Sequence, residues 1–243
     1  MGAIRTVSYH GTQLAFCVPN ALNHIRVQTF STKEPETLEW IESIPQGSVV
    51  WDIGANVGLY ACFAAKARHC RVIAFEPSVF NVELLARNIF LNQLTDNIVI
   101  VPLPLFEFLH EDTLRLTTMS WGGALSAFGV AHGFDGADID QVFEFRTLGM
   151  PMDDVVKKLN LPPPDYIKLD VDGIEHMILR GGREVLSGVR GVSVEINDGF
   201  AIQAAECRRL LADAGLRLVS KRHSDLMKTI PVFNETFNQV WAR

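Results

Sequence analysis

A strand that leads through a glycine-containing turn into an alanine-rich helix constrains the fold of this chain more than any other feature. Residues 48–53 are mostly apolar, as in a strand buried on both faces of a sheet, and residues 59–68 have a helical pattern. A second unit repeats this order, with a strand at 71–75 and a helix at 79–91, and a third strand follows at 98–101. The alternation predicts an α/β fold, a three-layer sandwich in which helices cover both faces of a mostly parallel sheet.

The residues before this core predict a small β/α extension. Alternating residues within 7–27 indicate a β-hairpin with its turn at 10–12, and a helix is expected over 35–44, where a proline lies in the first turn. We therefore expect an N-terminal extension over residues 1–46, packed on a core domain over residues 47–243.

The middle of the chain departs from this alternation. Residues 113–118 and 142–147 have strand patterns, and the glycine-containing stretch 121–136 separates them. We interpret the region as a β-excursion and a loop in place of a crossover helix. Long loops in compact domains are usually functional or mobile. Four side chains of this stretch are candidates for a lid or a wall of a ligand site: Trp121, Phe128, His132 and Phe134.

The second half returns to alternating strands and helices. The expected elements are a strand at 166–170, a helix at 175–180, a strand at 192–196, a helix at 202–214 and strands at 216–220 and 237–241. The last two strands are expected to complete the sheet as a hairpin-like pair.

Glycines and carboxylates follow three of the expected parallel strands. Gly54 and Gly58 lie in the turn after the first strand, Glu76 ends the second, and Asp170 begins an Asp-Val-Asp-Gly sequence after a later one. Ligands of open parallel sheets bind at the carboxyl ends of the strands. Gly54 permits a sharp turn that brings backbone amides against a ligand, and Gly58 permits a close approach at the helix start. A carboxylate at Glu76 can accept both hydroxyls of a ribose.

A dinucleotide-binding oxidoreductase is the main alternative for such a turn. Its G-x-G-x-x-G fingerprint needs a middle glycine that admits a pyrophosphate, whereas Asn56 occupies this position here. Asp52, before the turn, also suits a cationic amino-acid ligand better than a diphosphate. A non-catalytic protein of the same fold is a second alternative, against which the combination of Asp52, Gly54 and Glu76 argues.

Three segments together resemble the FkbM family of methyltransferases. They are Trp51-Asp52-Ile53-Gly54-Ala55-Asn56-Val57-Gly58-Leu59-Tyr60, Ala74-Phe75-Glu76-Pro77-Ser78 with Asn81, and Ile167-Lys168-Leu169-Asp170-Val171-Asp172-Gly173-Ile174-Glu175. Two shorter stretches are similar to the family as well, namely residues 33–38 and 122–126, and the resemblance covers about residues 30–215.

This resemblance implies a class I methyltransferase fold, Rossmann-like, with a seven-stranded sheet whose last strand is antiparallel. It also implies S-adenosylmethionine as the methyl donor and mostly O-methylation, often of sugars or polyketide-type natural products. We therefore expect a small-molecule acceptor, and the sequence does not indicate the oligomeric state.

Carried over by position, the resemblance assigns roles to individual residues. Asp52, Gly54, Ala55, Asn56 and Gly58 would hold the amino-acid end of the donor, and Glu76 would hold the ribose, with Pro77 and Asn81 beside the adenosine. Asp170 lies where this fold places a residue that faces the methyl group. Residues 102–105 lack the acidic side chain common in this fold at the end of the third strand, so backbone and apolar contacts are expected to hold the adenine.

Methylation of an alcohol requires a general base, because the hydroxyl proton must leave. Four residues are candidates because they follow the same strand end, namely Asp170, Asp172, Glu175 and His176. Asp170 and Glu175 are the first choices, and His176 is held in reserve. Three of these candidates also have a purely structural interpretation. Asp172 with the following glycine fits a plain turn, Glu175 fits the N-terminus of a helix, and His176 fits a packing histidine.

Lys168 is expected on the same side of its strand as Asp170, because side chains alternate along a strand. There it would neutralise a carboxylate such as Glu195. Asp170 together with Glu195, Asn197 and Asp198 offers oxygen ligands of the kind that Mg²⁺ binds. Acidic residues also gather at strand ends without metals, so magnesium is possible but no metal site is assigned.

Composition narrows the class of partner and the compartment. The formal net charge is -6 without a run of Lys or Arg, which argues against nucleic acid as the main partner. The four cysteines lack paired metal-type spacing and are expected to be buried thiols in a reducing compartment, most simply the cytoplasm. We expect no membrane span and no secretion signal.

Overall fold

The computed structural model describes residues 2–228 and 230–243. Its centre is a seven-stranded sheet with the order β11-β12-β10-β9-β3-β4-β5. The strands are β3 (Val49–Ile53), β4 (Arg71–Phe75), β5 (Ile98–Val101), β9 (Tyr166–Leu169), β10 (Gly191–Asn197), β11 (Arg217–Arg222) and β12 (Thr236–Ala242). The neighbours from β5 to β10 pair in parallel, whereas β12 is antiparallel to both β10 and β11. The predicted α/β sheet with an antiparallel last strand is confirmed.

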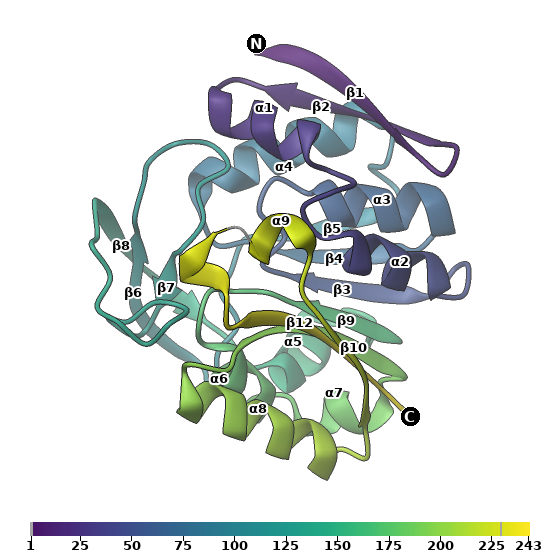
Figure 1. The fold of residues 1–243 in the computed structure, drawn as a ribbon. Helices are drawn as coiled ribbons and strands as arrows, with labels where there is room; N and C mark the ends of the chain where they lie inside the picture. Colours follow the sequence, from purple (N-terminus) through teal and green to yellow (C-terminus); the bar gives the residue numbers. More distant parts are fainter. Residues whose placement is uncertain (1, 229) are drawn as a thin grey trace.

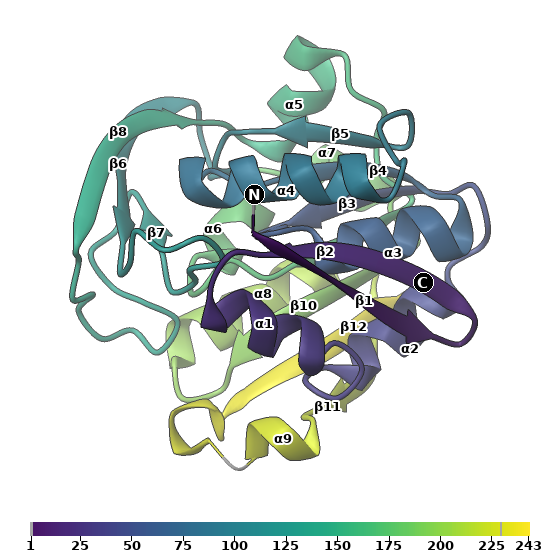
Figure 2. The ribbon, with the colours of Figure 1, turned by 90° about the horizontal axis from the view of Figure 1, so that it is seen from above.

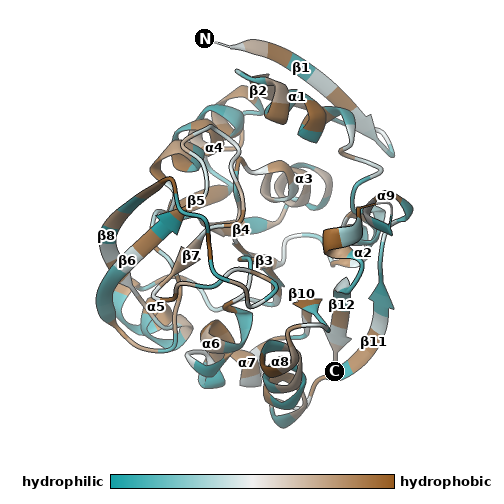
Figure 3. Cartoon of the chain, turned by 60° about the vertical axis from the view of Figure 1, so that its left-hand side comes forward, coloured by the Kyte–Doolittle hydropathy of each residue, from teal (hydrophilic) through white to brown (hydrophobic). Residues whose placement is uncertain are grey.

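Helices cover both faces of this sheet, as the alternation predicts (Figure 1). One face carries α2 (Pro35–Ser43), α3 (Leu59–Arg68) and α4 (Val79–Leu91). The other carries α5 (Met152–Leu159), α6 (Glu175–Arg180), α7 (Arg183–Gly188) and α8 (Ala201–Asp213). In α8 the hydrophobic residues face the sheet and the hydrophilic ones face outward (Figure 3).

The N-terminal residues form a hairpin and two helices on the α3–α4 side. Strands β1 (Ala3–Tyr9) and β2 (Thr12–Val18) pair in register around the predicted turn, and the hairpin crosses over α3 and α4 (Figure 2). The expectation that this hairpin extends to residue 27 is wrong, because α1 (Ala21–Gln28) occupies that stretch. Its start has a sequence signal that the β interpretation missed: the Asn20 side chain accepts a hydrogen bond from the Asn23 amide, a typical N-cap.

The middle of the chain forms a second, smaller sheet beside the main one (Figure 2). It consists of β6 (His110–Leu116), β7 (Ala127–Phe128) and β8 (Phe143–Gly149), in the order β7-β6-β8. The predicted β-excursion is therefore confirmed, although β6 begins three residues earlier than expected. The prediction of a loop in place of a helix is wrong, because α5 follows β8 directly. Acidic residues 153–154 begin α5 and Lys157 and Lys158 end it, which suits the helix dipole.

Between β11 and β12 the chain makes a short excursion that contains α9 (Asp225–Lys228) and a 3-10 turn, η1 (Pro231–Phe233). This segment lies at the same end of the main sheet as α1 (Figure 1). Together with the loop after β6, these two segments surround the carboxyl ends of the parallel strands, where the sequence analysis expects the ligand.

Candidate active site

A cavity of about 380 Å³ opens at the carboxyl ends of the central strands. Ile53, Phe75, Lys168 and Glu195, which lie on β3, β4, β9 and β10, reach its wall. Its size falls within the range of small-molecule sites. Of the predicted donor-binding and catalytic residues, seven line it: Gly54, Ala55, Asn56, Glu76, Pro77, Asn81 and Asp170.

The turn after β3 has the conformation that the glycine pattern predicts. Gly54 has a φ of +84°, and the amides of Gly54 and Ala55 both donate to the carbonyl of Phe75 on the neighbouring strand. A Cβ atom on Gly54 would lie 1.8 Å from the carbonyl oxygen of Asp170. The close approach that the structure shows is to the β9 end, and it requires glycine by itself. The approach of the turn's amides to a ligand stays a prediction.

Gly58 likewise serves packing. It has a φ of +84° at the start of α3, and an added Cβ would lie 2.3 Å from Cδ1 of Leu85 on α4. Gly58 lies outside the cavity wall that the described residues form, so the structure does not support its assignment to the donor's amino-acid end.

Glu76 is the centre of a buried hydrogen-bond network. Its Oε2 accepts from the amide of Asn56 at 2.8 Å, and its Oε1 accepts from the amide of Ser78 at 2.9 Å and from Nδ2 of Asn81 at 3.4 Å. Burial raises the pKa of Glu76 to about 7. These contacts fix the carboxylate at the end of β4, where each oxygen retains lone-pair capacity for a ligand hydroxyl.

Asn56 and Asn81 also hold the loop that follows β6. Both side-chain amides donate to the carbonyl of Gly123, at 2.7 and 3.0 Å, and Oδ1 of Asn81 accepts from the amide of Gly122 at 2.9 Å. We call residues 121–125 the roof loop; the residues from 123 onward line the cavity. Asn81 therefore has a structural role in this loop, and its contact with the adenosine stays a prediction.

The far end of the roof loop is bound to the β9 end. The amide of Leu125 donates to Oδ2 of Asp172 at 2.7 Å. Burial and, secondarily, Asp170 raise the pKa of Asp172 to about 6. Asp172 therefore does more than form a turn, because its side chain connects the loop after β9 to the roof loop.

One end of the cavity is apolar. Its wall there consists of residues after β5 and on the small sheet: Leu103, Pro104, Leu105, Leu114 and Phe128. The apolar character of this end fits the expectation that the adenine is held without an acidic side chain.

The other end carries charged residues. Nζ of Lys168 lies 3.0 Å from Oδ2 of Asp170 and 3.8 Å from Oδ1 of Asp52. Although burial opposes it, these carboxylates raise the pKa of Lys168 above its ordinary value. Asp52 lies behind the described cavity wall, where burial raises its pKa. Lys168 therefore forms ion pairs with Asp170 and Asp52 and not with Glu195, the carboxylate that we expected.

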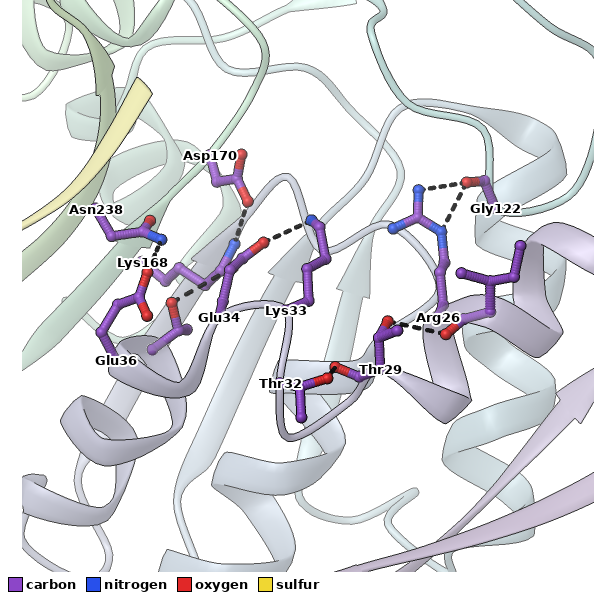
Figure 4. Close-up of polar contacts among 12 residues, drawn as sticks. Arg26, Thr29, Thr32, Lys33, Glu34, Glu36, Gly122, Lys168, Asp170 and Asn238 are labelled. Carbon is purple, nitrogen blue, oxygen red and sulfur yellow. Dashed lines mark hydrogen bonds and ion pairs between the residues drawn. The ribbon is translucent and has the colours of Figure 1, made fainter. Parts of the chain in front are cut away.

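The segment before α2 contributes residues to which the sequence analysis gave no role. Lys33 and Glu34 line the cavity and form an ion pair of 2.6 Å, shown beside the Lys168–Asp170 pair in Figure 4. Despite burial, Lys33 and Lys168 hold the pKa of Glu34 well below its ordinary value. The hydroxyl of Tyr60 also donates to Glu34. Only the resemblance of residues 33–38 to the family marked this stretch, since an ion pair of adjacent residues has no sequence signature.

Glu195 on β10 faces the same charged end. Burial and the nearby carboxylates of Asp170 and Glu34 raise its pKa well above the ordinary value. Glu195 thus adds a buried carboxyl group to the charged end of the cavity.

Glu175 and His176 lie outside the cavity wall. The carboxylate of Glu175 accepts from the amides of Val171 and Gly173 and from the side chain of Gln203. The ring of His176 packs against Phe200, and burial lowers its pKa to about 4. Both residues thus have structural roles in the described chain, and neither is placed to deprotonate a ligand in the cavity. Among the four candidate bases, Asp170 and Asp172 line the cavity. Oδ2 of Asp172 accepts from the amide of Leu125, which leaves Asp170 as the favoured base.

The proposed magnesium ligands are separated by other contacts. Asp198 pairs with Arg208 and Lys221, and Oδ1 of Asn197 accepts from the amide of Gly199. Within residues 2–228 and 230–243, no group of three or more His, Cys, Asp or Glu side chains is arranged to hold a metal ion.

The predicted lid residues have different environments. Phe128 lines the cavity, and the Trp121 indole donates to Glu83 at 3.0 Å. His132 packs against Phe200, and Phe134 packs against Phe233 of η1. All four cysteines are buried and unpaired, as expected. Over the described residues, every helix is too short or too polar to cross a bilayer.

Comparison with known proteins identifies a family. The sequence model of the methyltransferase FkbM domain matches residues 52–218. Among curated proteins, hexuronic acid methyltransferase AglP of Haloferax volcanii is 25% identical over 221 residues, which are 88% of this chain and 84% of that protein.

Solved structures with a similar fold include methyltransferases. A Streptococcus mutans protein described as a SAM-dependent methyltransferase has a TM-score of 0.58 and 10% identity, covering 99% of this chain and 55% of that one. A Clostridium thermocellum protein described as an rRNA-methylase has a TM-score of 0.52 and 8% identity, covering 87% of this chain and 95% of that one. At these identities the similarity concerns the fold, which is the Rossmann-like class I methyltransferase fold.

Proposed function

Because the chain belongs to the methyltransferase FkbM domain family, we propose that it transfers a methyl group from S-adenosylmethionine to a hydroxyl oxygen of a sugar-like small molecule. The observation that carries this proposal is the Asp170 carboxylate, held by Lys168 at the charged end of the cavity, at the opposite end from the apolar wall.

The residues present fit the donor. The buried Glu76 carboxylate suits a ribose, and the apolar wall around Leu103 and Phe128 suits an adenine ring. The acidic charged end suits a ligand that carries a positive charge on sulfur. The donor's methyl group would then lie toward Asp170, as the fold's general arrangement requires.

The chemistry at this end is an in-line displacement. When bound, S-adenosylmethionine supplies a methyl group activated by a positively charged sulfur. With the donor bound, the acceptor oxygen would take the methyl group, the sulfur would leave as a neutral thioether, and a free oxygen of the Asp170 carboxylate would accept the hydroxyl proton. Lys168 keeps that carboxylate in one orientation through the 3.0 Å contact to Oδ2. The remaining contribution of the chain is to align the acceptor oxygen with the methyl group.

A sugar-like acceptor is supported by the similarity to a hexuronic acid methyltransferase and by the polar groups beside Asp170. Lys33, Glu34 and Glu195 offer hydrogen-bond donors and acceptors to neighbouring hydroxyls. A dinucleotide-dependent oxidoreductase is disfavoured by the family match and by Asn56, whose side chain holds the roof loop where a pyrophosphate would need space.

Substituting the base tests this proposal. Asp170→Asn is expected to lower kcat by about 10²–10⁴-fold, because it removes proton acceptance, while calorimetry should still detect donor binding. The matched control is Asp198→Asn, which alters a carboxylate after the neighbouring strand that pairs with Arg208. The assay uses a panel of sugars, uronic acids and hydroxylated natural products.

Two results would overturn the proposal. No binding of S-adenosylmethionine by the wild-type protein at millimolar concentration would exclude the methyltransferase function. Full activity of Asp170→Asn would exclude Asp170 as the base. Activity after dialysis against a chelator, with and without Mg²⁺, tests the metal requirement separately, and we expect it to be unchanged.

A further inference from the structure

Three cations line the cavity, and they differ in how their charges are compensated. Lys33 is paired with Glu34, and Lys168 with Asp170. Arg26, on α1, has no carboxylate within 4.0 Å among residues 2–228 and 230–243. Arg26 is thus the cation whose charge remains available to a ligand in the cavity.

The guanidinium of Arg26 is held in a fixed orientation. Its Nε and Nη2 both donate to the carbonyl oxygen of Gly122, at 3.0 and 2.6 Å. This contact leaves Nη1 free of the carbonyl, and Figure 4 shows Arg26 and Lys33 pointing in the same direction from the N-terminal segment. A guanidinium oriented in this way loses little conformational freedom when it binds a carboxylate.

Arg26 is connected by hydrogen bonds to the half of the cavity that is proposed to hold the donor. Gly122 and the neighbouring Gly123 are bound by Asn56 and Asn81, and the same two residues contact Glu76. Arg26 therefore belongs to the network that surrounds the turn after β3. It also lies outside the segment that the family model matches, which begins at residue 52.

One charged group of the donor still lacks a partner of opposite charge among the residues predicted to bind it. Its amino-acid end carries a carboxylate, whereas the side chains predicted for this end are Asp52 and Asn56, neither of which is a cation. A carboxylate placed among Glu34, Glu76 and Asp170 would be repelled unless a cation faced it.

We propose that Arg26 binds the carboxylate of a ligand in this cavity, the amino-acid carboxylate of the donor being the source that its position favours. The inference rests on the proposed function. A uronic acid acceptor would present the same chemistry, so the experiment separates the two sources.

The experiment compares two ligands of the full-length protein by calorimetry. S-adenosylhomocysteine contains the amino-acid carboxylate, and 5′-methylthioadenosine lacks the whole amino-acid portion. For Arg26→Gln we expect the affinity for S-adenosylhomocysteine to fall about 10- to 100-fold, since hydrogen bonds to charged groups are worth about 1.5–3 kcal/mol. The affinity for 5′-methylthioadenosine should stay within about twofold of the wild type, because that ligand makes no such contact.

Arg115→Gln is the matched control. Nη1 of Arg115 also donates to a backbone carbonyl, that of Val130, but Arg115 lies outside the described cavity wall. Neither ligand should bind this variant more weakly than the wild type.

The other outcomes separate the alternatives. If S-adenosylhomocysteine affinity is unchanged and the KM rises only for carboxylated acceptors, Arg26 binds the acceptor's carboxylate and the proposal stands. An equal loss of affinity for both ligands would mean that Arg26 only anchors the roof loop, which overturns the proposal. So would unchanged affinities together with unchanged KM values. Failure of the wild-type protein to bind either ligand would instead contradict the proposed function.

Discussion

At the scale of single residues, Gly54 meets two requirements at once. Its φ of +84° lies in the left-handed region, and its α-carbon packs against the backbone of Asp170. The first requirement arises from the turn, which the sequence reveals. The second arises from β9, which is more than a hundred residues away. Gly54 thus joins the turn that is proposed to bind the donor to the strand end that carries the proposed base.

Two alanine substitutions separate these requirements. Gly11 in the β1–β2 turn has a φ of +85° but open space around it, so Gly11→Ala should cost only about 1–2 kcal/mol of the unfolding free energy. Gly54→Ala adds a collision with backbone atoms and should cost about 2–5 kcal/mol. Urea denaturation of both variants gives the comparison, and equal losses would contradict the packing role of Gly54.

Among the candidate bases, neighbouring residues have separate roles. Asp170, Glu175 and His176 follow one strand end, and the sequence ranks the first two equally. In the structure, Glu175 is bound by amides of the same loop and His176 faces Phe200. A stretch of seven residues can thus contain a proposed base, a loop anchor and a packing residue, because a turn and a helix start point successive side chains in different directions.

At the scale of elements, the roof loop is held by residues from separate parts of the chain. α1 contributes Asn23 and Arg26, which donate to the carbonyls of Trp121 and Gly122. α4 contributes Asn81, and the β9 end contributes Asp172. The misassignment of α1 as a strand therefore concealed the helix that positions the roof loop.

Hydrogen exchange can test how far Asn81 holds this loop. Asn81→Ala removes the acceptor of the Gly122 amide, so amides 122–125 should exchange about fivefold faster or more, since one buried hydrogen bond is worth about 1 kcal/mol or more. Asn92→Ala, on the end of the same helix, removes contacts to Ala15 on β2 and should leave these amides unchanged. Equal exchange in wild type and Asn81→Ala would show that the other contacts suffice.

At the scale of the whole molecule, acids buried in the cavity and behind its wall make the unfolding free energy depend on pH. Burial raises the pKa values of both Glu76 and Glu175 to about 7. Between the ordinary pKa of 4.5 and about 7, the unfolded chain has released these protons while the folded chain still holds them. The folded state thus binds more protons, and each group lowers the unfolding free energy as the pH rises through this window. His176, with a pKa lowered to about 4, acts in the opposite direction between pH 4 and 6.5.

The contribution of one acid can be isolated by comparing pH dependences. Glu175→Gln cannot ionise, so its unfolding free energy should fall less than that of the wild type between pH 4.5 and 7. The full slope for one proton is about 1.4 kcal/mol per pH unit. Denaturation midpoints across this range measure the difference, and parallel curves would show that Glu175 is already ionised at pH 5 in the folded protein.

From local patterns and strand ends, the sequence by itself determined the alternating α/β sheet and the cavity residues Gly54, Glu76 and Asp170. The antiparallel last strand and the place of Asn56 followed from the family resemblance of the sequence. Only the tertiary structure decided that Lys33, Glu34 and Arg26 reach the same cavity, that Lys168 faces Asp170 and Asp52, and that Gly58 packs on α4. The physical reason is that ion pairs and close contacts depend on distances between elements remote in sequence, whereas a strand, a turn or a helix depends on neighbouring residues.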